Sequence, residues 1–585
     1  MGGTTPISGS SVDLCVSTQT IGSSNPQDIN CSSSLGSGVS DSQGSSTISY
    51  SAPASGLVYV VASGGDAGGG NNPYIKLVAS VGYGGNVLPS ITVNEATTTA
   101  VVSSVRPMIG QTISNSLFME NISHGVSRFV SQPSGQFVTS TSTQAGTGDG
   151  VLSYLSNVLA SCVNSSAPGT DCPSLFGTIK TAAGSSLTPS NTVQAAFLVF
   201  GKPAANYSSL TQGSTGPYGS TSAPQTFSPT VLAYGGSYYS TYLSPFYSAV
   251  DANGNLWVTS CYGSGNFAVT EMVSSNNYSP VTIASDQTVT TSVMNMPTMP
   301  AIDASGNVWI SNDFAGQNFL TEIQPGNNNA ISTHLLPASD NQGGFDVSID
   351  TSGNVWVQGY SNSSTTGYPE VGMLSSTNPT SSFAYQAGAA GSGSDAMAVD
   401  GNGNVWIADC VNNTLTKLVP TGGTSYSYNN YSVTGLLNPA GIAIDPSNNV
   451  WIADSDCGAG AANILELPGG DVSTPTSYST TTITGSSTSF PISLASDSLG
   501  NIWAVDYNMN ELIELENNAG AYTGIVAGHL PSGQTFPHGI SIDSNGNIWV
   551  TDNGNRTNFT GGGVVEFVGM AAPVKTPLIG VPTAP

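Results

Sequence analysis

AVDANGNLWV, residues 249–258, is the first of seven copies of one pattern, and this pattern decides the fold of the chain. The other six copies end at Ile310, Val357, Ile407, Ile452, Ala504 and Val550. Together the seven copies contain every tryptophan of the 585-residue sequence, and these tryptophans fall 45 to 52 residues apart. Four-stranded blades of β-propellers repeat at this spacing. The sequence therefore predicts a mainly β fold with a seven-bladed propeller.

Each copy predicts a β-hairpin. In the fifth copy, Ile442 and Ile444 alternate before Asp445, and a second β-rich run starts at Val450 after a short polar turn. The aspartate can accept N–H groups of the turn, and glycine, or Asn448 in this copy, tolerates a positive φ. We interpret the aspartates as turn residues, with ligand binding as the alternative. They are Asp251, Asp303, Asp350, Asp400, Asp445, Asp497 and Asp543.

The last copy lacks a fourth strand. A third strand is predicted after most of the tryptophans, as in AVTEMV (268–273), and a variable Thr/Tyr/Ser-rich stretch supplies the fourth. The last copy has its third strand at 564–568 and then enters the Pro-rich tail 571–585. We expect residues 226–242 to donate the missing strand, because this would close the ring and remove the exposed sheet edges.

Two stretches carry a family resemblance. NPAGIAIDPSNNVWIAD (438–454) and FPHGISIDSNGNIWVTD (536–552) closely resemble NHL repeats, and the GNVW core also resembles the propeller of streptogramin (virginiamycin B) lyases. The resemblance covers about residues 226–570 and implies the propeller fold. It leaves the function open, since such propellers serve as binding modules, scaffolds and, in a few cases, enzymes.

The composition narrows the classes of partner. The chain has 8 Lys and Arg against 34 Asp and Glu, a formal charge of −26, and only 7% charged residues. It will repel nucleic acids and anionic membranes, so we expect neither as a partner. The sequence shows no transmembrane segment and no signal peptide. Its Ser, Thr, Asn, Gly and Tyr content suits a secreted or cell-surface protein whose export signal has been removed.

Six of the seven cysteines suggest three disulfides. We expect Cys15 to pair with Cys31, Cys162 with Cys172 across a polar loop, and Cys410 with Cys457 on loops of adjacent blades. Cys261 would remain unpaired. The alternative is that all seven are reduced, because a sequence does not fix connectivity.

The N-terminal part predicts two smaller domains. Residues 1–91 contain candidate strands at 6–16, 45–52, 56–65 and 74–82, and they resemble transthyretin-like or carboxypeptidase-regulatory-like β-sandwich domains. Residues 92–225 show helical periodicity, with Thr92 and Glu95 at capping-box spacing, and predict a small helical domain and linker. The propeller follows at 226–570. This layout resembles that of secreted bacterial NHL-repeat proteins.

Acidic residues gather after the tryptophans. We expect the loops that follow the second strands to meet at one face of the propeller. Hard oxygen ligands from several loops suit Ca²⁺ or Mg²⁺, and the alternative is that each side chain caps its own loop. The candidate ligand-binding face comprises Asn312, Asp313, Asp409, Asp454, Asp506 and Asp552, and its four last members are the candidate metal ligands.

One histidine carries the enzyme hypothesis. His538 is expected in the loop that leads into the last blade, where the resemblance to the lyases implies functional histidines, so it is a candidate general base. The glutamate that follows the GNLWFT-type strand in the lyases is absent from all seven copies here, which puts lyase activity in doubt. A purely structural histidine in a PxG turn is the alternative.

Three functions remain open. The leading hypothesis is a secreted, non-catalytic propeller that binds an extracellular glycan or protein on its loop face. The second is a metal-dependent lyase or hydrolase that uses His538 and the aspartates. The third is a structural surface protein whose N-terminal domains mediate self-assembly.

Overall fold

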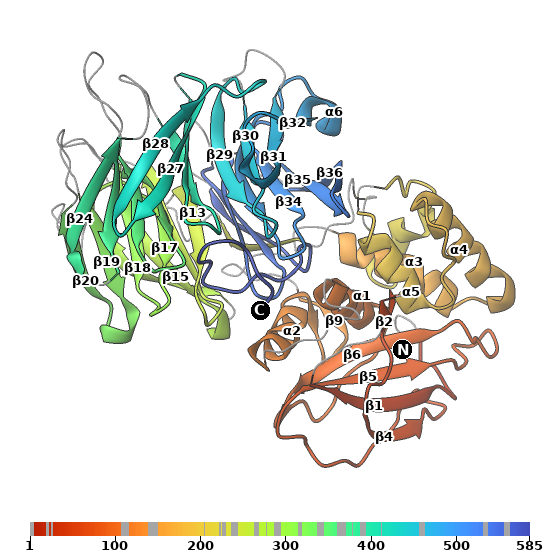
Figure 1. The fold of residues 1–585 in the computed structure, drawn as a ribbon. Helices are drawn as coiled ribbons and strands as arrows, with labels where there is room; N and C mark the ends of the chain where they lie inside the picture. Colours follow the sequence, from red (N-terminus) through yellow and green to blue (C-terminus); the bar gives the residue numbers. More distant parts are fainter. Residues whose placement is uncertain are drawn as a thin grey trace.

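A computed structural model gives the fold, and Figure 1 shows sheets arranged around one centre beside a smaller part that contains most of the helices. The residues described are 5–18, 23–24, 27–106, 116–138, 150–203, 205–220, 224, 230–235, 244–262, 268–276, 278–285, 294–313, 319–335, 344–359, 370–376, 378–386, 394–410, 412–455, 462–530, 536–554 and 562–585. None of the helices within these ranges combines the length and hydropathy that a membrane crossing requires.

Seven four-stranded antiparallel sheets form the C-terminal part of the described chain. Six of them use four consecutive strands each. These are β13 (Ser244–Val250), β14 (Leu256–Tyr262), β15 (Ala268–Val273) and β16 (Ser279–Ser285); β17 (Pro297–Ile302), β18 (Val308–Asn312), β19 (Phe319–Gln324) and β20 (Ala330–Leu335); β21 (Gly344–Ile349), β22 (Val355–Gly359), β23 (Glu370–Ser375) and β24 (Asn378–Gln386); β25 (Ser394–Val399), β26 (Val405–Asp409), β27 (Thr414–Gly422) and β28 (Ser425–Tyr431); β29 (Pro439–Ile444), β30 (Val450–Asp454), β31 (Asn463–Leu467) and β32 (Thr476–Ser479); and β33 (Pro491–Ser496), β34 (Ile502–Asp506), β35 (Glu511–Asn518) and β36 (Ala521–His529).

The seventh sheet joins distant parts of the chain. Its order is β12 (Thr230–Gly235), β39 (Gly563–Phe567), β38 (Ile548–Asp552) and β37 (Pro537–Ile542). β12 pairs antiparallel with β39. The prediction that residues 226–242 would donate the fourth strand is therefore confirmed.

The first strands of the sheets contact one another in a closed cycle. β13 contacts β17, the series continues through β21, β25, β29 and β33 to β37, and β37 contacts β13 again. This arrangement is propeller-like. Thr551 Oγ1 bridges the last and first sheets, because it donates to Phe246 O (2.6 Å) and accepts the N–H of Gly539 (2.9 Å). A Cβ at Gly539 would lie 2.9 Å from Phe246 O, so this close approach requires glycine.

One aspartate organises each turn between the first and second strands. Asp445 Oδ1 accepts the N–H groups of Ser447 (2.8 Å) and Asn449 (2.9 Å), and its Oδ2 accepts Asn449 Nδ2 (2.7 Å) and Trp451 Nε1 (3.0 Å). The same four bonds recur at Asp251, Asp303, Asp350, Asp400, Asp497 and Asp543. Asn448 has φ +68° in place of glycine. The role of these aspartates as turn residues is confirmed.

The tail 571–585 crosses the ends of the first strands at these turns. Ala572 N donates to Asp497 Oδ2 (3.0 Å), Val574 N to Asp543 O (3.1 Å), and Gly580 N to Ile349 O (3.3 Å). Ile579 and Val581 pack into the cores of two further sheets. The tail therefore links the sixth and seventh sheets to sheets elsewhere in the ring.

The N-terminal residues form one five-stranded sheet and short hairpins. The sheet has the order β4 (Ser34–Val39), β1 (Ser11–Ser17), β5 (Leu57–Ser63), β6 (Lys76–Tyr83) and β7 (Asn86–Val87). Two-stranded pairs are β2 (Ser23–Ser24) with β3 (Gln27–Asp28), β8 (Val130–Ser131) with β9 (Gln136–Phe137), and β10 (Thr215–Gly216) with β11 (Gly219–Ser220).

The strand predicted at 45–52 is wrong, since residues 45–53 form no strand and β4 takes the sheet edge instead. Ile48 lies flat against β4, because Gly36 leaves room for it: a Cβ at Gly36 would lie 2.7 Å from Ile48 Cγ2. The described residues of 1–91 thus contain no second stacked sheet of the kind that a sandwich has.

Five helices follow the sheet: α1 (Glu95–Val105), α2 (Ser116–Phe129), α3 (Val151–Val163), α4 (Pro168–Ala182) and α5 (Thr192–Phe200); a sixth, α6 (Thr480–Thr484), lies near β36. α1 begins at Asn94, whose side chain accepts the N–H of Thr97, so the capping box lies two residues beyond the expected Thr92. The loop expected between Cys162 and Cys172 is short, because α4 already contains Cys172. Sheet and helices share one hydrophobic core.

The first two predicted disulfides are present. Cys15 pairs with Cys31 and Cys162 with Cys172. Cys457 lies outside the described residues, as does the side chain of Cys261, so the pairing of Cys410 with Cys457 stays a prediction.

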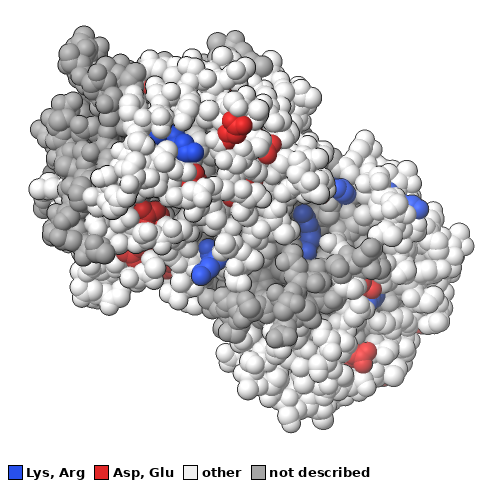
Figure 2. Space-filling model, viewed as in Figure 1, with Lys and Arg blue, Asp and Glu red and all other residues white. Residues whose placement is uncertain are grey.

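Two arginines connect the helices to the ring. Arg128 of α2 forms an ion pair with Glu566 on β39 and lies over the rings of Tyr278 (4.9 Å) and Trp549 (5.7 Å). Arg106, at the end of α1, donates to Met570 Sδ (3.7 Å). Burial raises the pKa of Glu566 to about 7, although Arg128 lowers it. Charged side chains are sparse over the face shown in Figure 2, so this buried pair differs from most of the surface.

Candidate functional site

A cavity of about 240 Å³ lies where the first strands of all seven sheets converge. Residues of these strands line it, and the tail contributes Val574, Thr576, Pro577, Leu578, Gly580 and Pro582. Most of the lining side chains are small and apolar. The aspartate turns hold the ends of the strands, and the tail lies across one side of the cavity, so the repeats and the tail together shape this space.

Asp346 is the carboxylate that lines this cavity. It stands ten residues before Trp356, where the other six copies have Tyr247, Met299, Ala396, Gly441, Ser493 and Gly539. The Asp346 side chain is 5% exposed, and its Oδ2 accepts the N–H of Met397 on the next sheet (2.7 Å). Burial raises the pKa of Asp346 to about 7, and the N–H groups of Met397 and Val347 oppose this rise.

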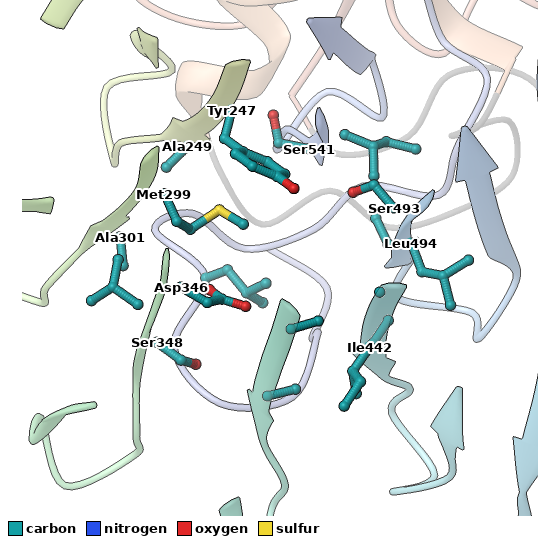
Figure 3. A pocket seen from close by; sticks show the side chains of 18 of the residues that line it. Tyr247, Ala249, Met299, Ala301, Asp346, Ser348, Ile442, Ser493, Leu494 and Ser541 are labelled. Carbon is teal, nitrogen blue, oxygen red and sulfur yellow. The ribbon is translucent and has the colours of Figure 1, made fainter. Parts of the chain in front are cut away.

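The side chains nearest to the hollow are both apolar and polar. Figure 3 shows Tyr247, Met299, Asp346 and Ser493 projecting toward it from four different strands. Ser248 and Ser541 also line the cavity and share a hydrogen bond (2.9 Å). An apolar hollow with a few convergent polar groups is the usual form of a small-ligand site.

His538 lies beside the cavity within an aromatic cluster. Its ring centroid is 4.0 Å from that of Phe246, 5.1 Å from Tyr247 and 6.1 Å from Tyr507. It belongs to strand β37, so its expected place in a loop is wrong. Burial lowers the pKa of His538 to about 3, and its Nδ1 has no hydrogen-bond partner among the described residues. The imidazole is neutral at physiological pH.

The aspartates three positions after the tryptophans accept backbone N–H groups. Asp454 accepts the N–H groups of Leu437 (3.0 Å) and Asn438 (2.5 Å). Asp506 accepts the N–H of Phe490 (3.0 Å) and the hydroxyl of Ser489 (2.5 Å).

Asp409, Asp552 and Asn312 also accept backbone N–H groups, whereas the hydrogen bond of Asp313 to Met296 is made by its backbone. Asp409 accepts the N–H of Asn412 (3.0 Å), and Asp552 those of Phe536 (3.1 Å) and Gly554 (2.6 Å). Asn312 accepts the N–H of Asn295 (2.9 Å), and Asp313 donates its own N–H to Met296 O (3.0 Å). Within the described ranges, no group of three or more His, Cys, Asp or Glu side chains could hold a metal ion. These contacts favour loop capping, and the Ca²⁺ or Mg²⁺ site stays an untested prediction.

Sequence comparison identifies one repeat. A model of the NHL repeat matches residues 535–556, which contain His538 and Trp549. No curated protein matches the chain. The expected resemblance to NHL repeats and to lyase-like propellers is confirmed.

Several solved structures are also similar to this chain. Virginiamycin B lyase from Staphylococcus aureus is 16% identical with a TM-score of 0.43, and the match covers 55% of this chain and 94% of that one. A structure described as streptogramin B lyase is 15% identical with a TM-score of 0.43, covering 55% and 93%. A gluconolactonase from Xanthomonas campestris is 11% identical with a TM-score of 0.34, covering 58% and 88%.

Sequence reasoning missed Asp346 and Tyr247. Both occupy the position ten residues before the tryptophan, where the seven copies share no common residue type. The available signal was the charge itself, because Asp346 is an acidic residue within a strand that the repeat pattern places in the core.

Proposed function

We propose that the chain is a secreted or cell-surface protein with a seven-bladed NHL-type propeller over residues 226–570, and that it binds a ligand in the central cavity without catalysing a reaction. The ligand is a small molecule, one unit of an extracellular glycan or one side chain of a protein partner. Residues 571–585 serve as a strap across the ring. Residues 1–225 form one domain, since sheet and helices share a core.

The central cavity is the observation that carries this proposal. Its volume of about 240 Å³ lies just below the usual range for small-molecule pockets, which suits a small ligand or one unit of a larger one. The polar groups of Tyr247, Asp346 and Ser493 can orient such a ligand through hydrogen bonds.

Two observations support an extracellular location. The pairs Cys15–Cys31 and Cys162–Cys172 are disulfide-bonded, and disulfides persist mainly in oxidising compartments. The second observation is the composition, since only 7% of the residues are charged and the Ser, Thr, Asn, Gly and Tyr content suits a secreted protein.

The properties of His538 favour binding over catalysis. A general base works best when its pKa lies near the working pH, whereas burial lowers the pKa of His538 to about 3. One observation favours the second candidate, a lyase in which His538 Nδ1 takes a proton from a bound substrate: this nitrogen has no hydrogen-bond partner among the residues that the structure describes. Turnover of a streptogramin B antibiotic with Mg²⁺, lost in His538→Ala, would overturn the non-catalytic proposal.

Filling the cavity tests the proposal directly. Full-length protein is screened by ligand-observed NMR against a set of monosaccharides and amino acids, together with Ser493→Phe and the matched small variant Ser493→Ala. We expect ligands that bind the wild type and Ser493→Ala and that no longer bind Ser493→Phe. Ligands that bind all three proteins equally would place the site elsewhere on the molecule.

A further inference from the structure

Asp346 is a buried carboxylate that has no cationic neighbour among the described residues. Its side chain is 5% exposed, and one of its oxygens, Oδ2, accepts the N–H of Met397. Desolvation and two backbone N–H groups account for its altered pKa, and no cationic side chain contributes. Buried carboxylates normally have a charged partner or become protonated, because an isolated charge in an apolar surrounding is costly.

The space in front of Asp346 can hold that partner. Figure 3 shows the Asp346 carboxylate at the wall of the hollow, with Tyr247, Met299 and Ser493 projecting into the same space. Asp346 and Tyr247 are the ionisable side chains among the lining residues, so the cavity wall supplies no positive charge of its own. The tail residues that line the cavity are all uncharged, and Lys575, between Val574 and Thr576, is exposed and does not belong to the lining.

We propose that this cavity binds the ammonium group of a small organic cation, with Asp346 as its counter-ion and the ring of Tyr247 as an aromatic wall. The inference rests on the proposed function, since it assigns the chemistry of the ligand in the same cavity. A cation gains energy both from a buried carboxylate and from the face of an aromatic ring. The formal charge of −26 adds a long-range attraction for cations.

The burial of Asp346 also implies that the affinity for a cation depends on pH. Because burial raises its pKa to about 7, the carboxylate is mostly ionised at pH 8 and mostly protonated at pH 6. His538, which contacts Tyr247, has a pKa of about 3 and stays neutral over this range. The lining residues of β17, β25, β29, β33, β37 and the tail carry no ionisable group. Cation affinity should therefore fall about tenfold from pH 8 to pH 6, in proportion to the ionised fraction.

Isothermal titration of the full chain with choline and with 3,3-dimethylbutan-1-ol tests the proposal, because the two probes have almost the same shape and differ by one positive charge. At pH 8 we expect choline to bind at least tenfold more tightly than the neutral alcohol. Asp346→Asn should weaken choline binding by roughly 10- to 100-fold, because it removes the negative charge that attracts the quaternary ammonium in a site of low dielectric. The matched control Asp471→Asn changes an exposed carboxylate between β31 and β32 and should bind choline like the wild type.

The outcomes separate this proposal from the proposed function. Equal affinity for the two probes, or full affinity for choline in Asp346→Asn, would overturn the cation assignment. Binding of neutral ligands that Ser493→Phe abolishes would then leave the cavity as a ligand site of another chemistry. Failure of choline and of every screened ligand to bind the wild type would overturn both. Folding of the Asp346→Asn variant is verified by a single cooperative urea transition of tryptophan fluorescence.

Discussion

The hydrogen bonds of the turn aspartate lead to a quantitative prediction for Asp445→Ala. The carboxylate accepts two backbone N–H groups, Asn449 Nδ2 and Trp451 Nε1, and Trp451 is fully buried. Alanine leaves the indole N–H and the amide without these acceptors, at about 1–3 kcal/mol for each buried donor. Allowing for partial rescue by water at the turn, we expect the free energy of unfolding to fall by about 3–5 kcal/mol.

Tryptophan fluorescence is a selective assay for this change. All seven tryptophans lie in the repeated copies, so their emission during urea unfolding reports on the ring and not on the N-terminal part. With a urea dependence of about 3 kcal/mol per molar, the midpoint should fall by roughly 1 M or more. Asp445→Asn retains an oxygen for the turn N–H groups and places an NH₂ toward the indole, so its midpoint should lie between those of the wild type and Asp445→Ala.

A control variant makes the prediction refutable. Asp471→Ala removes an exposed carboxylate located between β31 and β32 that accepts hydrogen bonds from Ser473 and Thr474 in its own loop, so its midpoint should fall much less than that of Asp445→Ala. If Asp445→Ala unfolds at the same urea concentration as Asp471→Ala, the four hydrogen bonds do not hold the tryptophan in place and the reasoning fails.

Three further predictions concern the ring and its surroundings. Thr551→Val removes the hydroxyl that bridges Phe246 and Gly539, so the urea midpoint of fluorescence should indicate that the free energy of unfolding falls by about 1–3 kcal/mol. The control Thr583→Val changes an exposed side chain and should leave the midpoint unchanged. Deletion of residues 571–585 exposes apolar surface that Val574, Ile579 and Val581 cover, so the free energy of unfolding should fall by about 3–5 kcal/mol. An unchanged urea midpoint would show that the tail is not part of the packed ring. The free energy of unfolding should decrease from pH 5 to pH 8, because burial raises the pKa values of Asp346 and Glu566 to about 7 and that of Glu514 to about 8, so that the folded state binds more protons than the unfolded state. His538 opposes this trend only below its unfolded pKa of about 6.5. Glu514→Gln should make the urea midpoint less dependent on pH.

The repeated part of the fold was predictable because its signal is local. The spacing from Asp445 through Asn449 to Trp451 is copied seven times, and each copy forms the same set of bonds within one hairpin. The donated strand β12 was predictable from the number of strands in each copy, since the last copy lacks a fourth strand and the segment before the first copy can supply it.

The N-terminal part was less predictable because its contacts are not local. Ile48 has the alternation of a strand, but it packs over Gly36 of a strand that apolar patterning does not reveal. The segment 168–182 contains Pro, Gly and polar residues and reads as a loop, yet Pro168 suits the first turn of a helix and Cys172 is fixed to α3 by its disulfide.

The candidate site depended on tertiary structure for the same reason. Asp346 becomes notable only when seven first strands converge, because its position is occupied by unrelated residue types in the other copies. Asp409, Asp454, Asp506 and Asp552 have the composition of a metal site, and only the structure reveals that each of them also accepts a backbone N–H.

The pairing of β12 with β39 sets an order of events during biosynthesis. β39 begins about 330 residues after β12, so the ring can close only after the ribosome has synthesised β39. Arg128 likewise can pair with Glu566 only after that residue has been synthesised, so two contacts of long sequence separation depend on β39. Contacts of such long sequence separation form slowly. Closure of the ring is therefore expected to be among the last folding steps.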